Sequence, residues 1–226
     1  MVVYEEIGST LDAAHALAAD GAPAGTLILA DAQTAGRGRS GRAWTSEKGA
    51  GIWLTLIERP GDSDALDVLS LRVGLAIAPS LDPYCDEHVF VKWPNDLYLG
   101  KRKLGGILVE ARWRDGAPEW VAIGVGINVR APQTEQQATG VRSGARRHDI
   151  LAAVVPAIRR AAQRTGRLDE MEVAAFAARD LALGQKCREP ADGVVRGIDS
   201  RGSLLVDIGS TTLAVRTGSL VLTEEQ

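Results

Sequence analysis

The spacing of apolar residues predicts that strands and helices alternate along most of the chain. Short apolar runs bounded by turn residues predict strands at residues 2–5, 26–30, 51–58, 91–93, 97–99, 104–110 and 119–129. Apolar positions with a helical period predict helices at residues 11–19, 63–81, 147–165 and 170–183, the third of them interrupted or kinked at Pro156. In the second helix the predicted buried face consists of Leu66, Leu69, Val73, Leu75 and Ile77.

Two regions depart from this alternation. Residues 131–146 are polar and contain glycine, which predicts an exposed loop. From residue 184 onward, short alternating runs separated by turn residues predict a small all-β module. Because a module of this size rarely folds alone, we expect it to pack on the rest of the chain. The predicted domains are therefore residues 1–183 and residues 184–226.

Composition and charge exclude several classes of protein. Apolar residues make up 45% and charged residues 24% of the 226 residues, which is typical of a globular protein rather than a disordered one. The net charge of −3 argues against a general nucleic-acid binder. Cys85 and Cys187 lie far apart without metal-ligand spacing, and the three histidines are scattered. With no signal-peptide pattern and no apolar run of membrane-spanning length, we expect a soluble cytoplasmic protein.

The segment VKWPNDLYLGKRKLGGILVE, at residues 91–110, carries the first candidate chemistry. It has the pattern strand, turn, strand, and Lys103 stands at the start of the last strand, shortly before Gly105 and Gly106. These glycines would let a ligand approach the backbone while the lysine points into a cleft. Charge runs usually face water, however, so for Lys103 alone a solvated basic turn is the simpler interpretation.

The segment DAQTAGRGRSGRAW, at residues 31–44, changes that balance. It places three glycines and three arginines within residues 36–42. Glycine lets the backbone curl around a ligand, and arginine supplies forked donors for phosphate or carboxylate. The G-x-G-x-x-G spacing matches the dinucleotide fingerprint. That fingerprint requires a helix that begins at the third glycine, whereas the next element predicted here is a strand at residues 51–58. We predict instead an ordered anion-binding loop, anchored by Trp44, that is mobile when empty.

Polar residues near the ends of two strands are further candidates. Ser9 and Thr10 stand where a strand meets a helix, so they can cap the helix or offer hydroxyl and free N–H groups to a ligand. Gly124 and Gly126 indicate close approach of another group to the backbone. Asn128 can read a polar ligand group or simply close the strand, and the sequence leaves both alternatives open.

Three blocks of this sequence together resemble the signature motifs of biotin protein ligases. They are GRGRSGRAW at residues 36–44, KWPNDLYLGKRKLGGILVE at residues 92–110 and GVGIN at residues 124–128. Ser9, Thr10 and Gln33 stand where that family has its opening Ser-Thr pair and its glutamine. The resemblance spans essentially the whole chain. It implies an α+β fold: a catalytic domain like that of class II aminoacyl-tRNA synthetases, with a mixed sheet and flanking helices, plus a small C-terminal SH3-like β-barrel.

The resemblance also implies a two-step ligase reaction. The carboxylate of biotin attacks the α-phosphate of ATP and gives biotinyl-5′-AMP and pyrophosphate; a lysine of a biotin carboxyl carrier domain then attacks the activated carbonyl and releases AMP. Biotin, ATP and Mg²⁺ are the expected small molecules. A homodimer is one of the oligomeric states left open. Because the sequence starts at its first predicted strand, without a preceding helix-turn-helix, we expect no DNA binding, and we expect no membrane association.

Residue roles follow from the same resemblance. Lys103 and Arg39 are the expected catalytic residues, with Lys103 between the biotin carboxylate and the α-phosphate. The expected biotin site consists of Ser9, Thr10, Gln33, Gly36, Arg37, Gly38, Arg39, Lys103, Gly106 and Gly124. The expected ATP site consists of Arg39, Arg42, Trp44, Lys92, Asn95, Asp96, Lys103 and Asn128. A Mg²⁺ ion is expected near Asp96, with its ligands unknown.

Some positions depart from the family pattern, and other functions compete with this one. Leu11 replaces a frequent asparagine, Ser40 replaces a basic residue of some members, and Gly51 with Ile52 replaces an Asn-Leu pair. These departures bear on the shape of the pocket and remove no charge that the chemistry needs. The alternatives are a lipoate or octanoate protein ligase, whose signature lacks the Gly-Arg-Gly-Arg loop, and a biotin-binding relative without transfer activity. A nucleic-acid binder is disfavoured by the acidic pI of about 5.7.

Overall fold

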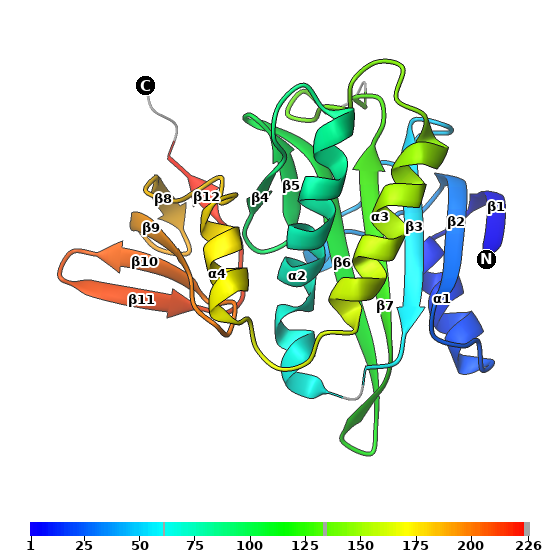
Figure 1. Cartoon of the computed structure of the whole chain (residues 1–226), viewed down its shortest axis with the longest axis horizontal. Helices are drawn as coiled ribbons and strands as arrows, with labels where there is room; N and C mark the ends of the chain where they lie inside the picture. The colour runs from blue at the N-terminus through cyan, green and yellow to red at the C-terminus, as the bar shows by residue number, and fades with distance from the viewer. Residues whose placement is uncertain (61, 133–134, 224–226) are drawn as a thin grey trace.

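A mixed sheet of seven strands forms the centre of the protein, in the order β1-β2-β3-β7-β6-β5-β4 (Figure 1). The computed structural model describes residues 1–60, 62–132 and 135–223. The strands are β1 (Val2–Ile7), β2 (Thr26–Gln33), β3 (Gly51–Glu58), β4 (Phe90–Lys92), β5 (Asp96–Leu99), β6 (Arg102–Arg114) and β7 (Ala117–Asn128). Only β1 and β2 are parallel neighbours; every other adjacent pair is antiparallel. The predicted strand, turn, strand pattern of residues 91–110 is therefore confirmed.

Helices cover both faces of this sheet. The helices are α1 (Thr10–Ala19), α2 (Ser63–Leu81), α3 (Arg147–Ala162) and α4 (Glu170–Ala177). In Figure 1, α2 and α3 lie side by side over one face. Leu56 of β3 belongs to the buried cluster under α2 and α3, whereas the next residue, Ile57, belongs to the cluster under α1. Since successive side chains of a strand point to opposite faces, α1 covers the other face.

The predicted β-rich end is a five-stranded antiparallel sheet, in the order β11-β10-β9-β8-β12. Its strands are β8 (Lys186–Glu189), β9 (Gly193–Ile198), β10 (Leu204–Ile208), β11 (Thr211–Val215) and β12 (Val221–Leu222). As expected, this module packs on the rest of the chain. Trp93 donates a hydrogen bond from Nε1 to the carbonyl of Gly202, at 3.0 Å. One buried apolar cluster includes residues of both sheets, so the division at residue 183 remains a prediction.

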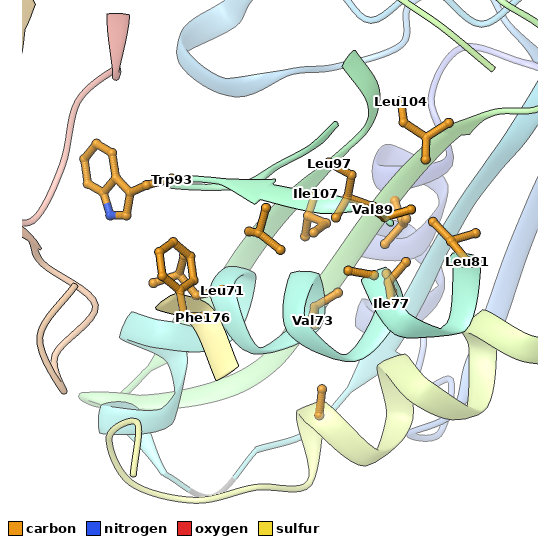
Figure 2. Packing of buried hydrophobic residues seen from close by; sticks show 14 of the residues in the cluster. Leu71, Val73, Ile77, Leu81, Val89, Trp93, Leu97, Leu104, Ile107 and Phe176 are labelled. Carbon is orange, nitrogen blue, oxygen red and sulfur yellow. The ribbon is translucent and has the colours of Figure 1, made fainter. Parts of the chain in front are cut away.

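The buried face of α2 is wider than its periodicity predicts. Leu69, Val73 and Ile77 are buried as expected, and Figure 2 shows Val73 and Ile77 among the residues packed between α2 and the sheet. Leu66 and Leu75 are only partly buried. The helix instead buries Val68 and Leu71, because these side chains face Gly202 of the C-terminal module. This second contact could not be read from a helical period.

Arg72 ties α2 to the segment that leads into α4. Its side chain is buried and donates to both carboxylate oxygens of Glu172, at 2.8 and 3.1 Å. It also donates to the carbonyls of Gly166 and Arg167, at 2.9 and 2.6 Å. The buried charge is thus paired and hydrogen-bonded, as a buried guanidinium must be.

Three expectations about the later part of the chain differ from the structure. The helix predicted at residues 147–165, with an interruption or a kink at Pro156, is not interrupted: α3 runs through Pro156 and ends at Ala162, and the kink stays a prediction. The helix predicted to reach residue 183 ends at Ala177, because the chain beyond it pairs with Val91 of β4. The loop at residues 131–146, whose residues 133–134 lie outside the described residues, is not simply exposed. Ala138 and Thr139 are buried where this segment runs beside β6.

No helix among residues 1–60, 62–132 and 135–223 combines the length and the hydropathy needed to cross a bilayer.

Candidate active site

A row of residues across four strands forms the floor of a cavity on the face of the sheet that α1 covers. The register places Trp53 of β3 beside Gly126 of β7, Gly126 beside Gly106 of β6, and Gly106 beside Asp96 of β5. The Trp44 indole lies on the two glycines. A Cβ added at Gly126 would come within 2.6 Å of this ring, and one added at Gly106 within 3.1 Å. Two facing glycines are therefore what lets the indole approach the sheet so closely here.

Lys103 reaches this face because β6 is irregular. Leu97 of β5 pairs with Gly105, whereas the next residue, Tyr98, pairs with Lys103, so one residue of β6 is unpaired between them. In a regular strand Lys103 and Gly106, three positions apart, would face opposite sides. The extra residue, Leu104, is buried in the apolar cluster on the other face, and the lysine side chain turns toward the cavity. A β-bulge commonly re-aims a side chain in this way.

The Lys103 ammonium has two neighbours in the cavity. Its Nζ lies 2.8 Å from Oδ1 of Asp96 and 5.1 Å from the centre of the Trp44 ring. The side chain is 29% exposed, so the ammonium lies at the boundary between cavity and solvent. This arrangement matches the sequence-based expectation that the lysine faces a cleft, rather than a solvated turn.

The backbone of Lys103 is held by segments that the sequence did not connect with it. Its N–H donates to the carbonyl of Gln137, and its carbonyl accepts from Thr139, at 2.8 and 2.9 Å. The side-chain amide of Asn128, which is buried, also points to this carbonyl, with the nitrogen at 3.5 Å. Asn128 therefore supports the lysine from behind and does not line the cavity.

The predicted anion-binding loop is a short hairpin, here called the arginine hairpin (residues 36–44). Backbone hydrogen bonds join Trp44 N–H to Gly36 O at 2.9 Å and Gly38 N–H to Arg42 O at 2.8 Å. A Cβ at Gly36 would lie 2.4 Å from the carbonyl oxygen of Trp44, so the close approach of the two strands requires glycine. At the tip, Ser40 adopts a left-handed conformation with φ of 56°. The mobility of this hairpin without ligand remains a prediction.

Two arginines of the hairpin, Arg39 and Arg42, make long hydrogen bonds to neutral acceptors. Arg39 donates from Nη1 to Oδ1 of Asn95 and to the carbonyl of Gly218, at 3.4 and 3.3 Å. Arg42 donates from Nε to the Arg39 carbonyl at 3.3 Å. Burial lowers the pKa of Arg39, and the negative charge of Asp96 partly offsets this effect. These contacts use neutral acceptors at long distances, so Arg39 can turn to an anion at little cost.

Hydroxyl and amide groups gather at the opposite end of the cavity, at the start of α1. Gln33 accepts at Oε1 from the backbone N–H and the hydroxyl of Thr10, at 2.8 and 3.0 Å. The amide nitrogen of Gln33 donates to Ser46 Oγ at 2.8 Å, and the Thr55 hydroxyl donates to Thr10 at 2.9 Å. These groups form a connected polar network beside the apolar side chain of Leu11, which also lines the cavity.

Two buried polar atoms near the cavity make no hydrogen bond to any described residue. Ser9 is the N-cap residue of α1, one of the two residues expected there, but its hydroxyl forms no capping bond and its Oγ has no partner among the described residues. The Nε1–H of Trp44 is buried in the same way. Native proteins rarely leave such groups unsatisfied, so both atoms are candidates for contacts with a ligand.

The cavity collects most of the predicted site residues from distant parts of the chain. It measures about 170 Å³ and is lined by Thr10, Gln33, Arg37, Gly38, Arg39, Arg42, Trp44, Asn95, Asp96, Lys103, Gly106 and Gly124, by Gly126, where close approach to the backbone was expected, and by residues that sequence reasoning missed, among them Trp53, Leu108 and Glu135. Four predicted residues, Ser9, Gly36, Lys92 and Asn128, do not line it. Trp53 and Leu108 sit in ordinary apolar runs, where no sequence signal separates them from core residues.

Lys92 lies on the far side of Asp96 from the cavity. Its Nζ is 5.4 Å from the centre of the Tyr98 ring, at cation–π distance. Burial lowers the pKa of Lys92; the charge of Asp96 raises it, and the nearby Lys103 lowers it further. Lys92 therefore adds positive potential beside Asp96, its partner across β4 and β5, without lining the cavity.

Asp96 is the residue best placed to share a metal ion with a ligand. The described residues contain no group of three or more His, Cys, Asp or Glu side chains arranged as a metal site. Mg²⁺, however, commonly binds through one or two carboxylates together with substrate phosphates. Asp96 lines the cavity beside Lys103 and fits that mode of binding.

The site as a whole suits a ligand with an apolar or polar ring at one end and anionic groups at the other.

Sequence comparisons identify relatives of this chain. A sequence model of the Biotin/lipoate A/B protein ligase family matches residues 6–128. The biotin--[acetyl-CoA-carboxylase] ligase of Mycobacterium tuberculosis is 34% identical over 97% of this chain and 87% of its own length. The bifunctional ligase/repressor BirA of Bacillus subtilis is 38% identical over 57% of this chain. The chain spans between 40% and 62% of the length of the first three curated relatives it matches.

Solved structures with the same fold give a consistent picture. The biotin protein ligase from Aquifex aeolicus, in complex with biotin and ATP, superposes with a TM-score of 0.81 over 99% of this chain and 98% of that chain, at 23% identity. At that identity the likeness concerns the fold alone. The biotin protein ligase from Leishmania major, in complex with biotinyl-5-AMP, is 26% identical, with a TM-score of 0.66 over 99% of this chain and 98% of that one.

Proposed function

The chain belongs to the biotin/lipoate A/B protein ligase family, and we propose that it is a biotin protein ligase. It would join biotin to ATP as biotinyl-5′-AMP, with release of pyrophosphate, and then transfer biotin to a lysine of a biotin carboxyl carrier domain. One observation carries this proposal. The ammonium of Lys103 and the guanidinium of Arg39 line the same small cavity as Trp44 and the Thr10–Gln33 network.

The two ends of the cavity suit the two parts of biotin. The Gln33 amide, the Thr10 hydroxyl and the buried Ser9 hydroxyl offer donors and acceptors for a ureido ring. Leu11 and the glycine floor offer apolar surface for the ring and its chain. The carboxylate would then point to the end that holds Lys103. This orientation is the one that the first reaction step requires.

Lys103 and Arg39 supply the electrostatics of the first step. A carboxylate oxygen must attack the α-phosphorus of ATP while the bond to the pyrophosphate oxygen breaks, and both reactants are anions. Lys103 would lie between them and offset their repulsion, with Arg39 turned from Asn95 toward the phosphate. A Mg²⁺ ion held by Asp96 and the phosphates would neutralise further charge when bound. The same cations would then hold the adenylate until transfer.

The second step needs an acceptor amine and a dry pocket. The uncharged amine of the acceptor lysine attacks the carbonyl carbon of the mixed anhydride, the bond from this carbon to the phosphate oxygen breaks, AMP leaves with the electron pair, and the nitrogen loses one proton to solvent to give the neutral amide. Water would hydrolyse the same anhydride, so the arginine hairpin and Trp44 have to exclude it. The cavity is smaller than the roughly 300–1,000 Å³ usual for ligand sites. We infer that the hairpin or Trp44 moves outward to admit ATP and biotin.

The proposal is tested by incubating the protein with ATP, Mg²⁺, labelled biotin and a carrier domain, followed by mass analysis of the carrier. The expected result is the mass of one biotin on the carrier, and none on a carrier whose acceptor lysine is replaced by arginine. Pyrophosphate release without carrier labelling would limit the protein to adenylate formation. If neither pyrophosphate nor labelled carrier formed, the proposal would be rejected. Competition binding of biotin against lipoate distinguishes a biotin ligase from the second candidate within this family, a lipoate ligase.

Other expectations stay predictions. The cytoplasmic location is one of them; the free thiols of Cys85 and Cys187 are compatible with it. The homodimer can be examined by sedimentation, and the expected lack of DNA binding by a mobility-shift assay.

A further inference from the structure

The first arginine of the hairpin, Arg37, contacts carboxylates of the protein rather than the phosphate side of the cavity. Its Nη1 donates to Oδ1 of Asp12, on α1, at 2.6 Å, and its Nη2 donates to Oε1 of Glu110, on β6. The two carboxylates come from two different elements, a helix and a strand. Both terminal nitrogens of Arg37 thus have charged partners, whereas Arg39 contacts neutral acceptors at more than 3.2 Å. A substrate anion would displace the contacts of Arg39 far more readily than those of Arg37.

Glu110 is in turn held by a chain of hydrogen bonds that reaches Trp120. The Nε2 of His15 lies 3.0 Å from Oε2 of Glu110, and the Nε1 of Trp120 lies 3.0 Å from Nδ1 of His15. An indole N–H can only donate, so Nδ1 of His15 accepts and carries no proton. The proton therefore sits on Nε2 and is donated to Glu110. This arrangement orients the carboxylate so that its other oxygen faces Arg37.

The contacts of Arg37 bear directly on the hairpin above the cavity. Arg37 pairs with Ala43 across the hairpin, next to Trp44. Trp44 covers the glycine floor beside Lys103. Anything that holds Arg37 against α1 and β6 therefore holds Trp44 and the hairpin over the cavity.

We propose that Asp12 and Glu110, with His15 behind Glu110, are positioning residues that latch the arginine hairpin through Arg37. Arg37 is then an anchor of the hairpin, while Arg39 and Arg42 are its anion-binding residues. The Arg37 side chain is 40% exposed and that of Asp12 is 61% exposed. Each partly exposed ion pair shifts the equilibrium between the closed and the open hairpin toward the closed form by a factor of about five at most. Such a latch keeps the hairpin closed yet lets it open for ligand exchange.

This inference rests on the proposed function only where it concerns the adenylate, so the first test uses no substrate. Trypsin cleaves after Arg37, Arg39 and Arg42 once the hairpin opens, and mass spectrometry of the fragments gives the rate at each bond. Glu110→Gln and Asp12→Asn should each raise these rates roughly two- to fivefold. Arg37→Lys, which keeps the charge, should raise them less. The matched control is Asp207→Asn, which removes the Arg196–Asp207 ion pair of the C-terminal sheet and should leave the hairpin rates unchanged.

A double-mutant cycle assigns the effect to Arg37. In an Arg37→Ala background, Glu110→Gln should have no further effect on cleavage of the bonds after Arg39 and Arg42, because its partner is gone. Full additivity of the two substitutions would overturn the latch. So would a Glu110→Gln variant that is cleaved no faster, or one that is cleaved faster throughout the chain and melts at a lower temperature.

The second test measures the consequence for the proposed reaction. In a trapping assay, Glu110→Gln should release biotinyl-adenylate several-fold faster than the native chain while the maximal rate of pyrophosphate formation stays the same. An unchanged release rate despite faster tryptic cleavage would overturn the role of the latch in retention. If the native chain formed no adenylate at all, the proposed function would fail, and the cleavage rates would still decide whether the latch exists.

Discussion

Lys103 Nζ and Asp96 Oδ1 lie 2.8 Å apart at the edge of the cavity, joined across neighbouring strands. Under the proposed function, the ion pair holds the ammonium near the place where the substrate carboxylate and the α-phosphate are expected to meet. A bound anion can replace Asp96 as the partner of the lysine, and a bound metal ion can replace Lys103 as the partner of Asp96. The pair therefore fixes the position of the charge before substrate arrives, which is the arrangement that electrostatic catalysis needs.

Replacing Lys103 should abolish most of the adenylate formation. Lys103→Ala removes a cation that would face two anionic reactants, and loss of one such stabilising group typically costs about 100- to 1,000-fold in rate. The measurement is the rate of pyrophosphate release with saturating biotin and ATP. Lys101→Ala, in the neighbouring exposed turn, serves as the control and should keep the native rate. A near-native rate for Lys103→Ala would remove this residue from the mechanism.

Replacing Arg39 should weaken retention of the adenylate. Arg39→Gly removes the contacts to Asn95 and to the carbonyl of Gly218, and with them the charge expected to hold the phosphate. We expect biotinyl-adenylate to escape about tenfold faster or more, in line with the loss of one charge-assisted hydrogen bond. Capture of the released adenylate by a chemical trap measures this rate. Retention equal to that of the native chain would contradict the role of Arg39.

The glycine floor predicts a steric effect. Gly126→Ala places a Cβ within 2.6 Å of the Trp44 ring, which must then tilt or leave the cavity. We expect a loss of about 1–3 kcal/mol in stability, as for overpacked sites, together with weaker binding of biotin. Denaturant unfolding and calorimetric titration measure the two effects. Gly8→Ala is the stability control, because its Cβ would have no heavy atom within 4 Å; equal stability of both variants would mean that the ring adapts.

Asp180 predicts a pH effect on stability away from the cavity. Burial raises the pKa of this carboxyl to about 6, and the hydrogen bond from the Ala182 N–H opposes the shift only partly. In the unfolded chain the pKa is about 3.9. The folded chain therefore binds more protons between about pH 4 and pH 6, and its stability falls as pH rises through this window, by about 3 kcal/mol in total.

Asp180→Asn should remove this slope. Asn cannot ionise and keeps the oxygen that accepts from Ala182, so the variant should gain stability over the native chain above pH 6 and little at pH 4. Urea unfolding at a series of pH values measures the difference. Asp115→Asn, in an exposed turn, is the control. A parallel pH dependence of native and Asp180→Asn chains would show that Asp180 is not the responsible group.

The amino-acid sequence by itself determined the local elements and the chemical inventory. The bounds predicted for β3 and α2 agree with the structure, since local periodicity and turn residues decide where such elements begin and end. The motif residues Lys103, Arg39, Trp44 and Gln33 do line one cavity. The sequence pattern could predict these element bounds and motif residues because each signal is contained within a few neighbouring residues.

Tertiary structure decided the rest, because it depends on pairing between distant segments. Only the register of β5 against β6 reveals the bulge that turns Lys103 to the face of Gly106; strict alternation would have sent it into the apolar layer under α2. Only the folded chain shows that Arg37 faces Asp12 and Glu110 while Arg39 faces Asn95. Lys103 and Gly106, three positions apart on β6, share a face because of the register of β5 against β6. Arg37 and Arg39, two positions apart in the hairpin, differ in role because their partners lie dozens of residues away in the sequence.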